Sequence, residues 1–164
     1  MPARSDIDPA DIPALLPYVM LIEKAGNQFL YRLVGSGVVR EVGHDATGTY
    51  VGSYLSVPEQ AEEAQAVFAR VFVLAKPVFA SGEFILKSGA SLALSLLSLP
   101  LSDDGTAANM TIATLVSRFN TWLLSSRGWL AGLPIKVWNV IDVEDAGQLA
   151  KLCLEWEQSS APAA

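Results

Sequence analysis

The chain has 164 residues, of which 51% are hydrophobic and only 17% are charged, whereas an average soluble domain has about 25% charged residues. This length suits one domain with its own core, and so apolar a composition predicts a homodimer or another protein partner that covers surplus apolar surface. The formal charge of −6 argues against a nucleic-acid partner, because phosphate binding needs a basic patch.

The first predicted elements are a short helix and a hairpin. Asp8 is a favourable N-cap residue, and Pro9 suits the first position of a helix. This helix should end at Pro17. The alternating pattern that follows predicts two strands over residues 18–24 and 28–34, joined by a turn that contains a glycine.

A glycine-rich segment follows the second strand. Gly35 should break the strand, and Ser36 should cap a short helix that runs through Val42. A G-x-G pattern begins at Gly35, but Arg40 stands where a phosphate-binding loop would need its third glycine. Residues 43–54 are rich in Gly and Thr and predict a loop.

Residues 58–75 form the clearest predicted helix. It begins with Pro58 and has acidic residues in its first turns, which suits the positive end of the helix dipole. Its apolar side chains recur at helical spacing, which predicts one buried face. That face consists of Ala64, Val67, Phe68, Val71, Phe72 and Ala75.

Three strands should complete the domain as an antiparallel meander over residues 78–87, 90–101 and 107–118. The two turns between them contain glycine, and the second, Asp103-Asp104-Gly105, is a strong hairpin signal. The order of elements predicts an α+β fold, with a five-stranded antiparallel sheet and helices on one face.

The chain after residue 118 has a different character, because it holds all four tryptophans. Residues 142–145 resemble the acidic beginning of a helix, so we expect a C-terminal helical extension. We expect the Trp-rich segment of residues 119–158 to pack on the domain or on a partner. The Ser/Ala/Pro tail, residues 159–164, should be disordered. The tryptophans are Trp122, Trp129, Trp138 and Trp156.

Cysteine content and hydropathy indicate a cytoplasmic protein. Cys153 is the only cysteine, so no intramolecular disulfide can form, which fits a reducing compartment. Residues 1–8 are polar and lack the apolar core of a signal peptide. The longest apolar stretch, residues 92–101, is too short to span a bilayer as a helix.

Three motifs carry a resemblance to a known family. They read R-x-D-I-D-P-x-x-I-P-x-L-L-P from Arg4, Y-R-L-V-G from Tyr31, and D-x-T-G from Asp45. Together they resemble a bacterial PAS-domain family (PAS_5-like, once filed as a domain of unknown function) over roughly residues 4–118. The structural residues of these motifs include Asp6, Asp8, Pro9, Arg32, Gly35, Thr47 and Gly48.

The resemblance implies a sheet with a helical cap, often an internal pocket, signal-dependent contacts with other proteins, and usually dimers. It implies no particular ligand or cofactor. The domain should therefore cover residues 4–118, and residues 119–158 lie outside the pattern of the family.

Asp6 and Asp8 are the first candidate for chemistry, because two carboxylates two residues apart could act as an acid and a base. The structural alternative is favoured: Asp8 caps the short helix, and one of the two carboxylates pairs with Arg32 or Arg4.

His44 and Cys153 offer little for metal or cofactor binding. His44 is the only histidine and lies in a predicted loop, where it can cap a turn. Cys153 lies among apolar residues of the expected C-terminal helix and suits a small buried side chain. We therefore expect no metal site, no cofactor and no catalytic triad.

A ligand pocket, if present, should be bounded by apolar residues of the long helix and the meander. The candidates are Phe68, Phe72, Glu83, Phe84 and Leu94. The carboxylate of Glu83 would either orient a ligand in the pocket or face solvent. Aromatic residues at helical spacing equally describe a solid core, so the sequence leaves both interpretations open.

The favoured function is a stand-alone PAS-type sensory or adaptor module that is not an enzyme, signals through protein contacts and can hold a small apolar ligand in its core. The alternative is a small α+β enzyme or ligand carrier with an apolar pocket. For that alternative the sequence offers only Glu83, Asp45 and His44 as polar groups, with no spacing that ties them together. A third possibility is a purely structural interaction domain.

Overall fold

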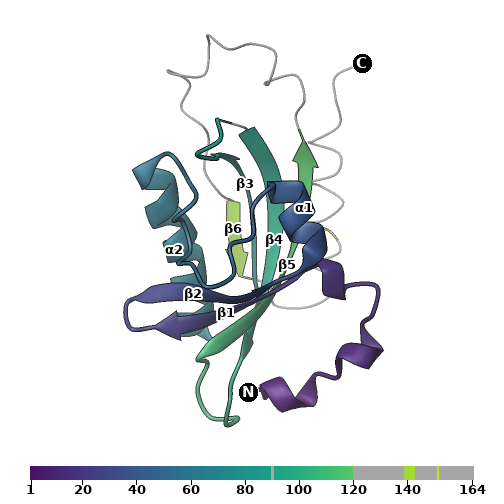
Figure 1. Cartoon of the computed structure of the whole chain (residues 1–164). Helices are drawn as coiled ribbons and strands as arrows, with labels where there is room; N and C mark the ends of the chain where they lie inside the picture. The colour runs from purple at the N-terminus through teal and green to yellow at the C-terminus, as the bar shows by residue number, and fades with distance from the viewer. Residues whose placement is uncertain (90, 120–138, 143–150, 152–164) are drawn as a thin grey trace.

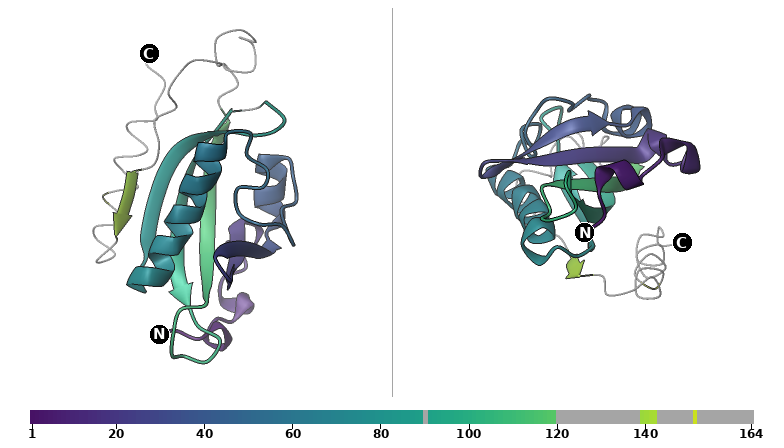
Figure 2. Two further views of the ribbon diagram at one scale, coloured as in Figure 1. Left: turned by 90° about the vertical axis from the view of Figure 1, so that its left-hand side faces the viewer. Right: turned by 90° about the horizontal axis from the view of Figure 1, so that it is seen from below.

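The computed structural model describes residues 1–89, 91–119, 139–142 and 151. Its centre is an antiparallel sheet with the strand order β2-β1-β5-β4-β3-β6. The helices α1 (Ser36–Val42) and α2 (Pro58–Leu74) accompany the sheet, and α2 runs along one of its faces (Figures 1 and 2). The predicted five-stranded sheet with helices on one face is confirmed, and β6 adds a strand that was not predicted.

The N-terminal segment forms three 3₁₀ turns, η1 (Arg4–Asp6), η2 (Pro9–Asp11) and η3 (Leu16–Tyr18), in place of the predicted helix. The predicted cap is present, because the Asp8 carboxylate accepts a hydrogen bond from the Ala10 amide at 2.8 Å. The prediction of one helix was wrong because Pro13 lacks an amide hydrogen and keeps the residue before it out of the helical region of backbone angles.

The predicted hairpin is confirmed as β1 (Val19–Ala25) and β2 (Gln28–Val34). Gly26 adopts a φ of +65° in the turn between them, which a residue with a β-carbon rarely adopts. Side chains alternate along each strand, so that one face is buried. The buried side chains of this face include Met20, Ile22, Phe29 and Tyr31.

The helix α1 (Ser36–Val42) begins where β2 ends, and close packing explains the glycine there. A β-carbon on Gly35 would lie 2.3 Å from the carbonyl oxygen of Pro17. Gly35 is itself the N-cap and makes no side-chain bond, so the prediction that Ser36 caps this helix was wrong. The crossing loop, residues 43–57, includes the predicted loop of residues 43–54 and connects α1 to α2.

The helix α2 (Pro58–Leu74) confirms the strongest helical pattern in the sequence. Its buried residues include Ala64, Val67, Phe68 and Val71. Ala75, predicted on this buried face, is instead the exposed left-handed cap that follows the helix. A polar contact fixes its first half, because the side chain of Gln60 accepts a hydrogen bond from the Ile85 amide at 3.0 Å.

The predicted meander is confirmed as β3 (Val78–Ile85), β4 (Ser91–Leu101) and β5 (Met110–Phe119). The short strand β6 (Asn139–Asp142) pairs antiparallel with the free edge of β3. Of the expected C-terminal extension, residues 119–158, the structure describes only residues 119, 139–142 and 151, and its tryptophans and Cys153 lie outside the described residues.

The core lies between one face of the sheet, α2 and the crossing loop (Figure 2). Ile22 on β1, Val71 on α2 and Val78 on β3 are fully buried at its centre. Sheet and helix therefore share one apolar interior, which is where a pocket would have to form.

Candidate functional site

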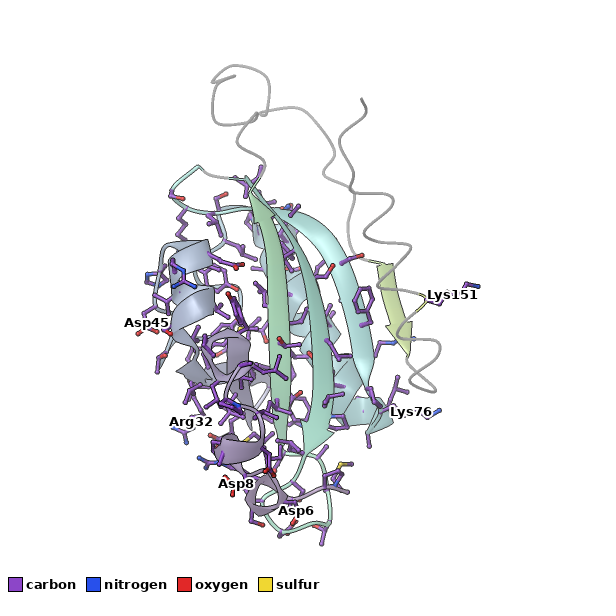
Figure 3. The ribbon with its side chains drawn as sticks, turned by 90° about the vertical axis from the view of Figure 1, so that its right-hand side faces the viewer. Asp6, Asp8, Arg32, Asp45, Lys76 and Lys151 are labelled. Atoms are coloured by element: carbon purple, nitrogen blue, oxygen red, sulfur yellow. The ribbon has the colours of Figure 1, made fainter. Side chains whose placement is uncertain are left out.

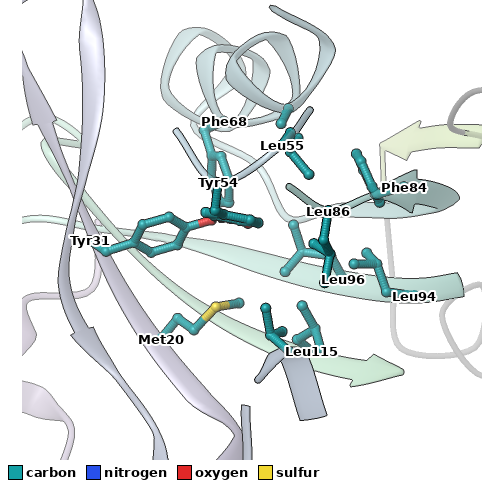
Figure 4. Close-up of a pocket in the computed structure, with 12 residues that line it drawn as sticks. Met20, Tyr31, Tyr54, Leu55, Phe68, Phe84, Leu86, Leu94, Leu96 and Leu115 are labelled. Carbon is teal, nitrogen blue, oxygen red and sulfur yellow. Dashed lines mark hydrogen bonds between the residues drawn. The ribbon is translucent and has the colours of Figure 1, made fainter. Parts of the chain in front are cut away.

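An interior cavity of about 40 Å³ lies between the sheet, α2 and the crossing loop (Figure 4). In Figure 4 Phe68 reaches in from α2, while Leu94, Leu96 and Leu115 form the wall on the side of the sheet. The lining is almost wholly apolar and includes no charged side chain. Its residues are Met20, Tyr31, Val42, Tyr54, Leu55, Ala64, Phe68, Phe84, Leu86, Leu94, Leu96 and Leu115.

Two tyrosines supply the hydroxyl groups of this cavity. The hydroxyls of Tyr31 and Tyr54 are 2.9 Å apart and form one hydrogen bond, in which either oxygen can be the donor. Burial raises the pKa of Tyr31 well above its usual value, and the neighbouring Tyr54 hydroxyl adds to the effect. Burial likewise raises the pKa of Tyr54. Both phenols are therefore neutral at physiological pH.

The D-x-T-G motif holds the crossing loop against Tyr31. The Asp45 carboxylate accepts a hydrogen bond from the Thr47 amide at 2.9 Å, which lowers the pKa of Asp45. Gly48 follows with a φ of +79°, and its amide donates to the carbonyl of Tyr31 at 2.8 Å. The Tyr31 amide donates in turn to the Thr49 carbonyl at 3.0 Å. The motif thus fixes the backbone of Tyr31.

The far end of the same loop is tied to the end of β3. The Lys87 amide donates to the carbonyl of Tyr54 at 3.0 Å, and the Lys87 ammonium donates to the carbonyl of Ser53 at 2.5 Å. The Ser56 amide donates to the Ile85 carbonyl at 3.0 Å. Tyr31 therefore reaches the cavity from a strand, and Tyr54 reaches it from a loop.

A second hollow, an open cleft of about 460 Å³, lies on the outer side of this loop. It shares Val42, Tyr54 and Leu86 with the interior cavity. The rest of its lining is mainly polar and includes His44, Thr49, Ser53, Lys87 and Ser88. The side chain of Tyr54 therefore stands in the wall between an apolar interior and a surface cleft that carries several polar side chains.

The predicted pocket residues divide into three groups. Phe68, Phe84 and Leu94 line the cavity. Phe72 does not line it: its ring stacks on that of Phe29, with centroids 5.2 Å apart and planes 2° from parallel. Glu83 lies in β3 opposite Ala93, and its side chain lies outside the described part.

The paired carboxylates of the N-terminal motif act on the backbone. Asp6 accepts a hydrogen bond from the Ala3 amide at 2.9 Å, just as Asp8 caps η2 (Figure 3). Arg32 pairs with Glu23 across the β1–β2 hairpin. The expected partnership of Arg32 with Asp6 or Asp8 was therefore wrong, because the neighbouring strand offers a nearer carboxylate.

Sequence reasoning missed both tyrosines as site residues. A signal for Tyr31 existed, since it alternates with Phe29 along β2 on the buried face. Tyr54 lies in an irregular loop, where no periodic pattern indicates which side chains point inward. His44, the only histidine, is exposed and lines the outer cleft.

A family model described as "PAS domain" (PAS_5) matches residues 1–116 of the chain. The chain belongs to the PAS domain family. The match includes every residue that lines the interior cavity, so the cavity is part of the PAS domain itself. The match confirms the resemblance to a PAS-domain family that the three sequence motifs indicated.

Solved structures of PAS domains share this fold at low sequence identity. The PAS domain of an HTR-like protein from Haloarcula marismortui is 15% identical, with a TM-score of 0.50, and the match covers 66% of this chain and 90% of that chain. The PAS domain of Bordetella pertussis BvgS is 14% identical, with a TM-score of 0.50, and covers 92% and 96% respectively.

A third structure, a complex of Vibrio cholera VqmA with ligand and DNA, is 13% identical, with a TM-score of 0.53, and covers 95% of this chain and 71% of that chain. No curated protein matches the chain. These likenesses establish the PAS fold.

The part of this PAS domain that the structure describes shows no cluster of three or more His, Cys, Asp or Glu side chains that could hold a metal ion. No helix of that same part is long and apolar enough to cross a membrane.

Proposed function

We propose that this PAS-type sensory module binds a small, largely apolar molecule in its interior cavity and passes the resulting change to another protein. The observation that carries the proposal is the cavity itself, which has apolar walls and a pair of neutral tyrosine hydroxyls at one end. Apolar walls with a few placed polar groups are the usual composition of a small-molecule site.

The size of the cavity restricts the ligand. Sites for drug-sized ligands are commonly about 300–1,000 Å³, whereas this cavity is about 40 Å³. A ligand must therefore be very small, or the wall of the cavity must move when the ligand enters.

The composition of the lining supports binding over catalysis. An enzyme would need titratable groups that converge on the substrate. The Asp45 carboxylate is bonded to the Thr47 amide instead, and His44 faces the outer cleft. No observation on the described residues favours the alternative of a small enzyme.

We infer that the output is a protein contact, with a homodimer as the first partnership to test. Apolar side chains exposed on the outer side of the domain support this inference, because a partner that covers them removes apolar surface from water and so stabilises the complex. They include Leu15, Leu16 and Leu33, with exposures of 53%, 39% and 44%, and Val73 on α2, with an exposure of 83%. The Trp-rich segment of residues 119–158, also a candidate contact, lies largely outside the described residues.

Native mass spectrometry of the full chain, purified gently from its own host, tests the proposal. We expect a small molecule to copurify with the wild type and to be absent from the Ala64→Leu variant, because Ala64 lines the cavity and a leucine there fills it. Ala66→Leu is the matched control, since Ala66 is an exposed position on the same helix. Equal amounts of bound molecule in the wild type and in Ala64→Leu would place the site elsewhere.

A further inference from the structure

The route into the cavity passes Tyr54. Ten of the twelve lining residues are buried, and the two that are only partly buried are Val42 and Tyr54. These two residues also line the outer cleft. Leu86, which is buried, also lines both hollows, so the wall between the cleft and the interior consists of Val42, Leu86 and the ring of Tyr54.

The interior cavity is too small for a ring-sized ligand as long as the ring of Tyr54 stands in its wall. The interior cavity of about 40 Å³ has no room for another ring, whereas the adjoining cleft measures about 460 Å³. If the ring of Tyr54 turned outward into the cleft, the interior cavity would gain the volume that this ring now fills and would open to the cleft. The vacated volume would have the shape of a phenol ring.

The hydrogen bond between the tyrosines determines what can fill that volume. The backbone of Tyr31 is bonded to the loop through both its amide and its carbonyl, and its hydroxyl is bonded to Tyr54. Among the described residues no other partner of the Tyr31 hydroxyl is found. When Tyr54 leaves, a buried hydroxyl loses its partner, which is unfavourable unless the incoming molecule replaces the bond.

The outer cleft can accept the displaced phenol. The cleft is open to solvent and its lining includes the polar side chains of His44, Thr49 and Lys87, so the displaced Tyr54 hydroxyl can exchange a buried hydrogen bond for contacts with polar groups and water. The ring turns about its side-chain bonds, so this displacement leaves the backbone hydrogen bond from the Lys87 amide to the Tyr54 carbonyl in place.

We propose that Tyr54 is a built-in plug of the cavity, and that the ligand is a neutral, ring-sized molecule with one hydrogen-bonding oxygen. Such a molecule displaces the Tyr54 ring and takes over its bond to the Tyr31 hydroxyl. The class includes phenols and aryl ketones and excludes anions, because no charged side chain lines the interior cavity. This inference rests on the proposed function and specifies its ligand class and its selecting residue, Tyr31.

The test uses p-cresol, which is the tyrosine side chain as a free molecule, and toluene, which has the same ring without the hydroxyl. Methyl NMR of the full chain follows Leu94, Leu96 and Leu115 during each titration. We expect p-cresol to bind the wild type about 3- to 10-fold more tightly than toluene, the contribution of one hydrogen bond. Tyr31→Phe should remove this preference.

Variants of Tyr54 test the plug separately. Tyr54→Ala should bind p-cresol more tightly than the wild type, because no energy is needed to displace a ring that is absent. Should Tyr54→Ala fail to fold, Tyr54→Phe still tests the idea, since its ring is held in place without a hydrogen bond and is displaced more easily. Tyr50→Phe is the matched control, because Tyr50 lies on the same loop, is 43% exposed and does not line the cavity.

Two outcomes would overturn the inference. Equal affinity for p-cresol and toluene in both the wild type and Tyr31→Phe would show that the cavity binds rings without discriminating by their hydroxyl group. This outcome would leave the proposed function intact. Absence of any shift at the three leucines, in the wild type and in both Tyr54 variants, would contradict the inference and the proposed function together.

Discussion

Each of the two cavity tyrosines keeps the hydroxyl of the other satisfied in an apolar interior. Such a bond contributes only about 0.5–1.5 kcal/mol net, yet removing one partner leaves the other hydroxyl buried and unpaired, at about 1–3 kcal/mol. The pair therefore stabilises the fold less through the strength of its bond than through the cost of separating its members.

A double-mutant cycle measures this dependence. We expect Tyr31→Phe and Tyr54→Phe each to lower the free energy of unfolding by about 1–2 kcal/mol, and the double variant to lower it by clearly less than the sum. Urea unfolding of the four proteins gives the coupling energy. Strictly additive losses would show that the hydroxyls do not interact in solution.

The same pair makes stability depend on alkaline pH. Burial holds the pKa of both tyrosines above about 10, the value in the unfolded chain. Above that pH the unfolded chain releases these protons while the folded chain retains them, so the contribution to stability is complete below pH ~10 and is lost as the pH rises further. Unfolding midpoints between pH 8 and 11 should fall more steeply for the wild type than for the Tyr31→Phe/Tyr54→Phe variant. Midpoints that fall equally with pH in the two proteins would contradict the raised pKa of the two buried tyrosines.

At the scale of single residues, the sequence predicts which side chains point into the core only where they belong to a helix or a strand with a regular period. The alternation of β2 was enough to place Tyr31 on the buried face, although it was not recognised as a site residue. The position of Tyr54 depends on backbone bonds that join β2, the loop and the end of β3, and these have no sequence period. Phe72 has helical spacing, but the nearby ring of Phe29 holds it away from the cavity.

At the scale of elements, the junction of β2, η3 and α1 depends on a close backbone approach. The sequence correctly predicts a break at Gly35 and a helix after it, but it assigns the cap to Ser36. The physical requirement is absence of a β-carbon, because the carbonyl of Pro17 occupies its place. A contact between segments this far apart in the chain cannot be derived from local propensity.

Gly35→Ala tests this junction. We expect a loss of about 2–3 kcal/mol in unfolding free energy, since an added methyl group would overlap a backbone oxygen that cannot rotate away. Ser36→Ala, at an exposed neighbouring position with no capping bond, should change stability by less than about 0.5 kcal/mol. Similar losses in the two variants, by thermal or urea unfolding, would show that the contact with Pro17 is not limiting.

At the scale of the whole molecule, one sheet and one long helix enclose both the core and the cavity. The hairpin, the meander and α2 could be predicted because their hydrophobic periods are strong and their turns contain glycine. The strand β6 could not, because four residues give too short a period and their pairing with β3 is remote in sequence. Whether the interior is solid or hollow depends on how the side chains pack, which residue type alone does not determine.

The central claim is that the interior of this PAS domain admits a small apolar guest. Methyl NMR of the full chain under xenon pressure tests it most directly, because dry apolar cavities bind xenon. The account predicts shifts of the Leu94, Leu96 and Leu115 methyl groups in the wild type and in Ala66→Leu, and their loss in Ala64→Leu. Unshifted methyl groups in the wild type, or equal shifts in Ala64→Leu, would contradict it.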